Sequence, residues 1–149
     1  KAYRSLDQFE KAVATYETVL RRDSARCDIL YDLGTTYMKV KDYQKAVMVF
    51  AKKVACDTSS GYRFASHLNA AMSYMQLKDF KGAEENTLSS IELRPDNVQA
   101  GLTLAQNYVQ MGNLAKQRAA YKKVIKENPD SPKSSEFRAK LNKLEKSIR

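Results

Sequence analysis

The chain is poor in the residues that most enzymatic chemistry requires. It has one histidine, two cysteines and five scattered glycines among 149 residues. No nucleophile or metal ligand stands at a compatible spacing from His67, so we expect a packed structural histidine. No glycine-rich phosphate loop, GxSxG or HExxH pattern is present. The sequence therefore predicts a non-enzymatic protein without a metal site or cofactor.

Long apolar runs are also missing. The longest, residues 46–51, is far shorter than the roughly 20 residues that span a bilayer. No signal-peptide pattern opens the chain. We therefore expect protein partners rather than a membrane.

The two cysteines form no CxxC motif, which indicates neither a disulfide-rich scaffold nor a zinc site. Cys27 begins one expected helix and Cys56 ends its antiparallel partner, so the two ends should lie close together. A disulfide would also need Cα atoms within about 7 Å. We favour two buried or half-buried thiols and keep the disulfide as the alternative.

Small and aromatic residues recur at a fixed period. Ala12, Ala46 and Ala83 each follow an aromatic residue by three positions, in steps of 34 and 37 residues. The tyrosines in phase with them are Tyr3, Tyr37, Tyr74 and Tyr108. Spacings of three, four and seven place such residues on one stripe of a helix. Short polar turns between the stripes predict antiparallel helix pairs that bury their cores only by stacking.

This pattern resembles the tetratricopeptide repeat (TPR) family over nearly the whole chain. The second unit carries the family positions as Leu30, Leu33, Gly34, Tyr37, Tyr43, Ala46 and Phe50; the third as His67, Ala70, Ala71, Tyr74, Phe80, Ala83 and Pro95; the fourth as Leu104, Ala105, Tyr108, Leu114, Tyr121 and Pro129. The resemblance implies an all-α, right-handed superhelical α-solenoid of antiparallel helix pairs.

We divide the chain into one TPR array. It has a partial repeat at 1–24, repeats at 27–60, 64–97 and 98–131, and a capping helix at 134–148. Helices are expected at 9–21, 27–40, 43–56, 63–77, 80–93, 97–111, 114–127 and 134–148. Because Lys1 would fall inside the first helix of its pair, we expect a fragment of a longer protein. The truncated face offers a surface for self-association.

Two departures from the family pattern fall near the same junction. Three extra residues lie within 57–62, which predicts an exposed, mobile loop. Lys53 stands where the family has a small residue, which predicts looser packing.

The resemblance implies that the first helices of the pairs line a concave groove for a peptide or a short helix. The inward positions are Tyr31, Asp32, Thr35, Met38, Lys39, Leu68, Asn69, Met72, Met75, Gln76, Leu102, Gln106 and Gln110. One subclass clamps a terminal carboxylate with Lys, Asn and Arg; here only Asn69 matches, and Asp32 has the wrong sign.

We expect an exposed apolar strip along this groove. Its members would be Tyr31, Met38, Leu68, Met72, Met75 and Leu102. Methionine is flexible and polarizable, which suits varied apolar ligands. The alternative is that Leu68, Met72 and Met75 pack within the array.

The positive charge is concentrated at the C-terminal end. Residues 114–149 hold 11 basic and four acidic side chains, out of a net +9 for the chain. Phe137, Leu141 and Leu144 predict a capping helix with a polar outer face. The basic patch on it is Lys133, Arg138, Lys140, Lys143 and Lys146.

The sequence thus favours an interaction scaffold or adaptor that binds a peptide or amphipathic helix in the groove. The alternative is a basic adaptor whose C-terminal helix contacts nucleic acid or an anionic surface. Salt dependence separates the two, because phosphate binding weakens steeply with ionic strength.

Overall fold

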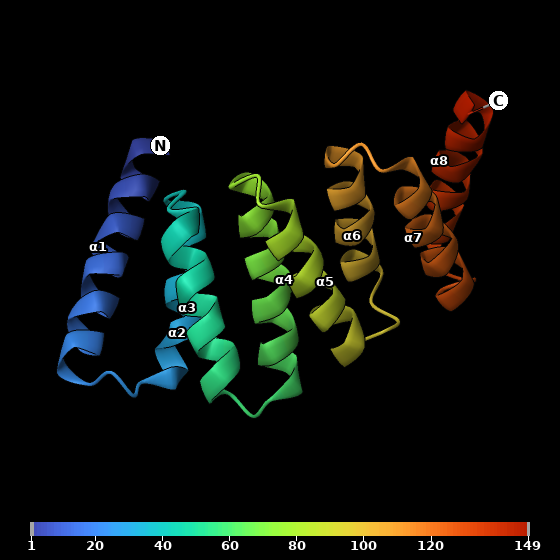
Figure 1. Cartoon of the computed structure of the whole chain (residues 1–149). Helices are drawn as coiled ribbons and strands as arrows, with labels where there is room; N and C mark the ends of the chain where they lie inside the picture. The colour runs from blue at the N-terminus through green and yellow to red at the C-terminus, as the bar shows by residue number, and fades with distance from the viewer. Residues whose placement is uncertain (1, 149) are drawn as a thin grey trace.

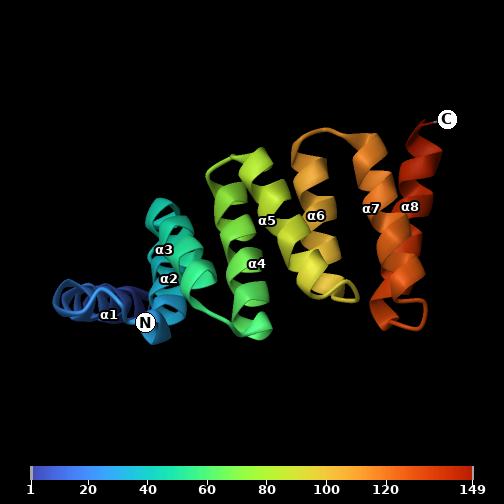
Figure 2. The same cartoon turned by 60° about the horizontal axis from the view of Figure 1, so that its bottom comes forward.

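The chain is a row of helices that stand side by side in sequence order. The computed structural model describes residues 2–148, and these form eight α-helices and one short 3₁₀ helix, with no strand among them. The elements are α1 (Ala2–Arg22), η1 (Cys27–Ile29), α2 (Leu30–Lys39), α3 (Tyr43–Cys56), α4 (Ser60–Gln76), α5 (Phe80–Leu93), α6 (Val98–Gln110), α7 (Leu114–Glu127) and α8 (Pro132–Ile148). Helices α1 and α8 lie at opposite ends of the row in both views (Figure 1, Figure 2).

Three turns within the helix pairs share one design. Lys41, Lys78 and Gly112 each take a positive φ of about 60°, the left-handed conformation that ends a helix. The next residue is Asp42, Asp79 or Asn113, whose side chain accepts a hydrogen bond from the backbone N–H three positions on and so caps the following helix. The cap satisfies a donor that the helix start would otherwise leave unpaired.

Helix α1 is longer than expected. A helix was expected to begin at residue 9, but α1 runs continuously through that point. The residue in register with the capping Asp42 is Gln8, and glutamine is a poor helix cap but a good helix former. Asp7 pairs with Lys11 along the same helix, with Nζ and Oδ2 2.7 Å apart. The expected two-helix form of the partial repeat is therefore wrong for residues 2–22. Lys1 and the side chain of Tyr3 lie outside the described part of the chain.

The α3–α4 junction is shorter than the expected loop over 57–62. Only residues 57–59 separate the two helices, and the extra residues lengthen the start of α4. Lys53 is not loosely packed either. The residue is 3% exposed. Its Nζ lies 2.5 Å from Asp57 Oδ2 and donates to the Cys27 carbonyl at 3.0 Å.

A disulfide joins Cys27 to Cys56, with their Cα atoms 6.0 Å apart. The interpretation as two free thiols, which the sequence favoured, is therefore wrong. Antiparallel packing brings the start of the α2 segment next to the end of α3, and both side chains point into the same gap. The bond closes the second repeat at the end away from its turn.

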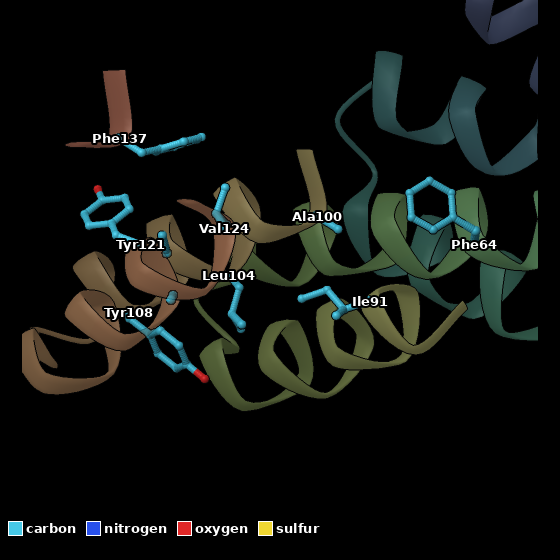
Figure 3. Close-up of a cluster of buried hydrophobic side chains, with 10 residues drawn as sticks. Phe64, Ile91, Ala100, Leu104, Tyr108, Tyr121, Val124 and Phe137 are labelled. Carbon is cyan, nitrogen blue, oxygen red and sulfur yellow. The ribbon is translucent and has the colours of Figure 1, made fainter. Parts of the chain in front are cut away.

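Two apolar clusters form the core. The first lies between α1, α2, α3 and α4 and centres on Leu33 and Phe50, which are 1% and 0% exposed. Gly34 lets α2 approach α3 here, because a Cβ would lie 2.6 Å from the Phe50 ring. The second cluster runs from α4 to α8 (Figure 3). Helix α4 contributes to both, so it connects the two halves of the array.

Helix α8 covers the open end of the second cluster. Phe137 is 1% exposed, and its ring centroid lies 5.8 Å from that of Tyr121 on α7 (Figure 3). Leu141 and Leu144 are half-buried against the same cluster, whereas Ile148 is 52% exposed. The helix thus covers the array from Ser134 to Leu144.

The array has an inner and an outer side. Helices α2, α4 and α6 contact one another in succession, while within residues 2–148 no contact of that extent joins α3 to α5 or α5 to α7. The first helices of the pairs therefore lie on the closer, inner side. None of the described helices is both long and apolar enough to cross a membrane.

Candidate functional site

A hollow opens on the inner side between α2 and α4. It has a volume of about 400 Å³, within the range of ligand-binding clefts. Its lining consists of Thr35, Met38, Lys39, Tyr43, Asn69, Met72 and Gln76. Six of these seven were expected at inward positions. Tyr43 was not, because its register position marks it as a packing residue of α3, yet it is only half-buried.

The hollow combines a thioether surface with polar groups. Met72 is 40% exposed and Met38 is half-buried, so both sulfur-bearing side chains remain accessible. Thr35 donates its hydroxyl to the Asp32 carbonyl at 2.9 Å. Asn69 Nδ2 donates to Tyr31 Oη at 3.2 Å, which leaves its amide oxygen available.

Lys39 and Gln76 supply the unengaged polar groups. Both side chains are exposed, and neither has an ion-pair or hydrogen-bond partner within residues 2–148. A long lysine side chain beside methionines can lay its methylenes on an apolar ligand and hold its ammonium toward a carboxylate or carbonyl. The hollow thus suits a ligand with an apolar body and a hydrogen-bonding backbone.

The continuous exposed strip that the sequence predicted does not form. Of its six members only Met72 is exposed. Tyr31 and Met38 pack against the first core cluster, and Leu68 and Leu102 against the second. Because neighbouring repeats bury these side chains between them, the apolar surface shrinks to the hollow. Met75 is half-buried outside it.

The remaining predicted groove residues lie outside the hollow. Gln106 and Gln110 are exposed on α6, and Asp32 is exposed on α2. Tyr31 instead lines a second hollow of about 280 Å³ with Tyr62, Ala65 and Arg94. The structure therefore groups the predicted residues of α2 and α4 and leaves those of α6 apart.

Perturbed ionisable groups lie in separate pairs rather than in one site. Burial, together with a hydrogen bond to Glu84, raises the pKa of Tyr108 to about 12. Burial and a 2.6 Å hydrogen bond to Glu17 likewise raise the pKa of Tyr37. The hydrogen bond from Tyr37 in turn lowers the pKa of Glu17, with Lys45 alongside, and the hydrogen bonds from Lys116 and Tyr108 lower the pKa of Glu84. The Tyr37–Glu17 pair and the Tyr108–Glu84 pair each join two neighbouring repeats, and neither pair lines the α2–α4 hollow.

His67 has a structural role in this arrangement. It is half-buried on α4, with Nδ1 3.0 Å from Asn86 Oδ1 on α5. Within residues 2–148 no group of three or more potential metal ligands gathers. Its hydrogen bond joins the two helices of the third repeat.

The basic patch is only partly available. Lys140 Nζ pairs with Glu136 at 2.6 Å, and Arg138 donates to the Pro129 carbonyl at 3.3 Å. Lys133, Lys143 and Lys146 are exposed without an ion-pair partner in the described part of the chain. The acidic residues of this end therefore neutralise part of its charge.

Comparison with known proteins yields two tetratricopeptide repeat models, one over residues 1–60 and another over 64–97 and 99–131. The chain is 27% identical over 138 residues to the peptidyl-prolyl cis-trans isomerase FKBP4 of Bos taurus, a match to 85% of this chain. It is 25% identical to RNA polymerase II-associated protein 3 of Mus musculus over 93% of this chain. It spans 30% and 22% of the lengths of these two relatives.

Solved structures agree on the fold. A crystal structure of MamA superposes with a TM-score of 0.79 at 23% identity, covering 97% of this chain and 81% of MamA. The first TPR of Spaghetti (RPAP3), solved bound to the HSP90 peptide SRMEEVD, superposes with a TM-score of 0.65 at 22% identity, over 85% of this chain and 98% of that one. With the matched repeat models covering most of its length, the chain belongs to the tetratricopeptide repeat family.

Proposed function

We propose that the chain is a non-enzymatic interaction scaffold that binds a segment of a partner protein on its inner side. The observation that carries the proposal is the α2–α4 hollow of about 400 Å³ with its accessible methionines. An amphipathic helix or an extended segment would insert an apolar side chain between Met38 and Met72. Lys39 and Gln76 would meet carbonyl groups of the same segment.

One matched protein was solved with a bound peptide, which supports a protein ligand here. The first TPR of RPAP3 was solved with the HSP90 peptide SRMEEVD, in which three of the last four residues are acidic. In this chain Asp32 is exposed on the same side without a basic partner among residues 2–148. Asn69, the single match to a carboxylate clamp, is engaged by Tyr31. These features favour an apolar segment over an acidic terminus.

The test is a selection of peptides from a random displayed library, followed by titration of the selected peptides. Met72→Glu places a charge in the hollow and should weaken binding at least about tenfold, a change of about 1.4 kcal/mol. Met48→Glu is the matched control, since Met48 is 56% exposed on α3 outside the hollow. Equal binding by both variants, with unchanged helicity, would refute the groove.

The second candidate function is a basic adaptor that acts through α8. The observation in its favour is three exposed lysines without an ion-pair partner among residues 2–148, namely Lys133, Lys143 and Lys146. Binding to phosphate groups would fall steeply with salt, and Glu substitutions at these lysines would remove it. Binding of the selected peptides should survive both changes if the groove is the site. Self-association through the outer face of α1 stays a prediction, to be checked by light scattering.

A further inference from the structure

The disulfide has an unusual neighbour. Lys53 Nζ lies 4.0 Å from Cys27 Sγ, while also contacting the Cys27 carbonyl and Asp57. Cys56 Sγ instead lies 3.6 Å from the Lys53 carbonyl oxygen, at the C-terminal end of α3. The two sulfurs therefore face groups of opposite polarity.

Access to the two sulfurs is also unequal. An open hollow of about 440 Å³ reaches both cysteines, with Lys53, Asp57 and Tyr62 along its wall. Cys56 is exposed, whereas Cys27 is half-buried. Tyr62 packs over Lys53, with Nζ 4.6 Å from the ring centroid, and helps to hold the ammonium in place.

We propose that Cys27–Cys56 is a thiol–disulfide exchange site, in which a small-molecule thiol attacks Cys56 and Lys53 stabilises the departing Cys27 thiolate. Exchange is faster when the leaving sulfur is the better stabilised thiolate and the attacked sulfur is the accessible one. A nearby ammonium favours the thiolate of Cys27. A carbonyl acceptor and a helix C-terminus favour the protonated thiol of Cys56.

The exchange takes place in two balanced steps. In the first, the thiolate of the reductant forms a bond to Cys56 Sγ, the Cys27–Cys56 bond breaks, and its electron pair leaves on Cys27 Sγ. In the second, another reductant thiolate attacks the reductant-derived sulfur of the mixed disulfide. The bond to Cys56 breaks, and its electron pair leaves on Cys56 Sγ, which takes a proton from water. The protein gains two electrons, and two reductant thiols become one disulfide.

Other charged groups face the same gap. Asp57 follows α3, Asp28 lies in η1, and Arg26 precedes η1 and pairs with Asp28, Nη2 to Oδ2 2.6 Å. Asp57 competes with a thiolate for Lys53, and the hydrogen bond from Lys53 lowers the pKa of its carboxyl. Two variants should therefore change the exchange in opposite directions.

The first test is the rate at which dithiothreitol reduces the oxidised chain. Lys53→Met keeps the length of the side chain but removes the ammonium, and should slow reduction on the order of threefold. Asp57→Asn removes the competing carboxylate and should speed it. Lys52→Met is the control, since Lys52 is exposed without an ion-pair partner among residues 2–148. General unfolding would instead speed reduction in every variant.

The second test locates the attack. Glutathione added to the oxidised chain, followed by acid quenching and peptide mass spectrometry, should find the adduct on Cys56. In the reduced chain, the pH profile of alkylation should give Cys27 a pKa below the ordinary thiol value of about 8.5, and Lys53→Met should raise it. Three outcomes would each overturn the proposal. They are an adduct mainly on Cys27, equal rates of reduction for Lys53→Met and Lys52→Met, and failure of oxidised glutathione to re-form the Cys27–Cys56 bond in the reduced chain.

Discussion

At the scale of single residues, hydrogen bonds between polar side chains add to the apolar contacts that hold the array together. Tyr108 donates to Glu84 at 2.9 Å, and Lys116 reaches the same carboxylate oxygen at 2.8 Å. Thr87 takes the place that Phe50 has in the second repeat, and its hydroxyl donates to the Ala83 carbonyl within its own helix. Buried polar groups are tolerated when they are hydrogen-bonded in this way.

The raised pKa of Tyr108 predicts a loss of stability in alkali. Its folded-state pKa of about 12 exceeds the unfolded value of about 10. A raised folded pKa contributes stability that is full below pH 10 and lost as pH rises toward 12. Tyrosinate absorbance should show a late component that Tyr108→Phe reduces.

The control for that titration is Tyr62→Phe, which removes a tyrosine that is 51% exposed. The late component should remain in this variant. Urea unfolding near pH 9 and near pH 11 should show a smaller alkaline loss for Tyr108→Phe than for the unmodified chain. An unchanged late component in Tyr108→Phe would contradict the assignment.

At the scale of elements, caps and turns decide where helices end. Asp42, Asp79 and Asn113 cap the start of the second helix in each pair, whereas Gln8 at the same register allows α1 to continue. The extra residues after α3 have no such cap pattern inside them and extend α4. Local hydrogen bonding thus overrides an alignment based on period alone.

The capping helix gives the prediction at this scale. Phe137 is 1% exposed against Tyr121, so Phe137→Ala should cost about 3–5 kcal/mol. Ile148→Ala should cost far less, since Ile148 is 52% exposed at the end of the same helix. Thermal melting of both variants decides the matter. Equal melting temperatures would mean that α8 does not cover the array.

At the scale of the whole molecule, the core is divided rather than continuous. One cluster holds α1 to α4 together and the other α4 to α8, with α4 in both. In a stacked array each repeat contacts only its neighbours, so a disturbance at one end need not spread to the other.

Hydrogen exchange can test this division. Phe137→Ala should raise amide exchange in α6, α7 and α8, because it opens the second cluster. Amides of α2 and α3 should keep their protection, since Leu33 and Phe50 lie in the first. A uniform increase along the chain would show a single cooperative unit instead.

The sequence alone determined the family, the helix pairs and most of the hollow's lining. Recurring tyrosines, alanines and polar turns are local signals. Because the helix period alone decides which residues share a face, these faces can be predicted without the partner helix. For this reason the sequence alone predicts that Met38, Asn69 and Met72 lie on the inner side.

Only the tertiary structure decided which side chains on those faces are exposed and which are paired. Leu68 and Leu102 share the inner register with Met72, but neighbouring repeats half-bury them. Lys53 departs from the family pattern, yet Asp57, Tyr62 and the Cys27 carbonyl surround it. Exposure and pairing depend on how closely two repeats approach, and that distance is set by side chains far apart in the sequence. The pattern of one helix contains no such information.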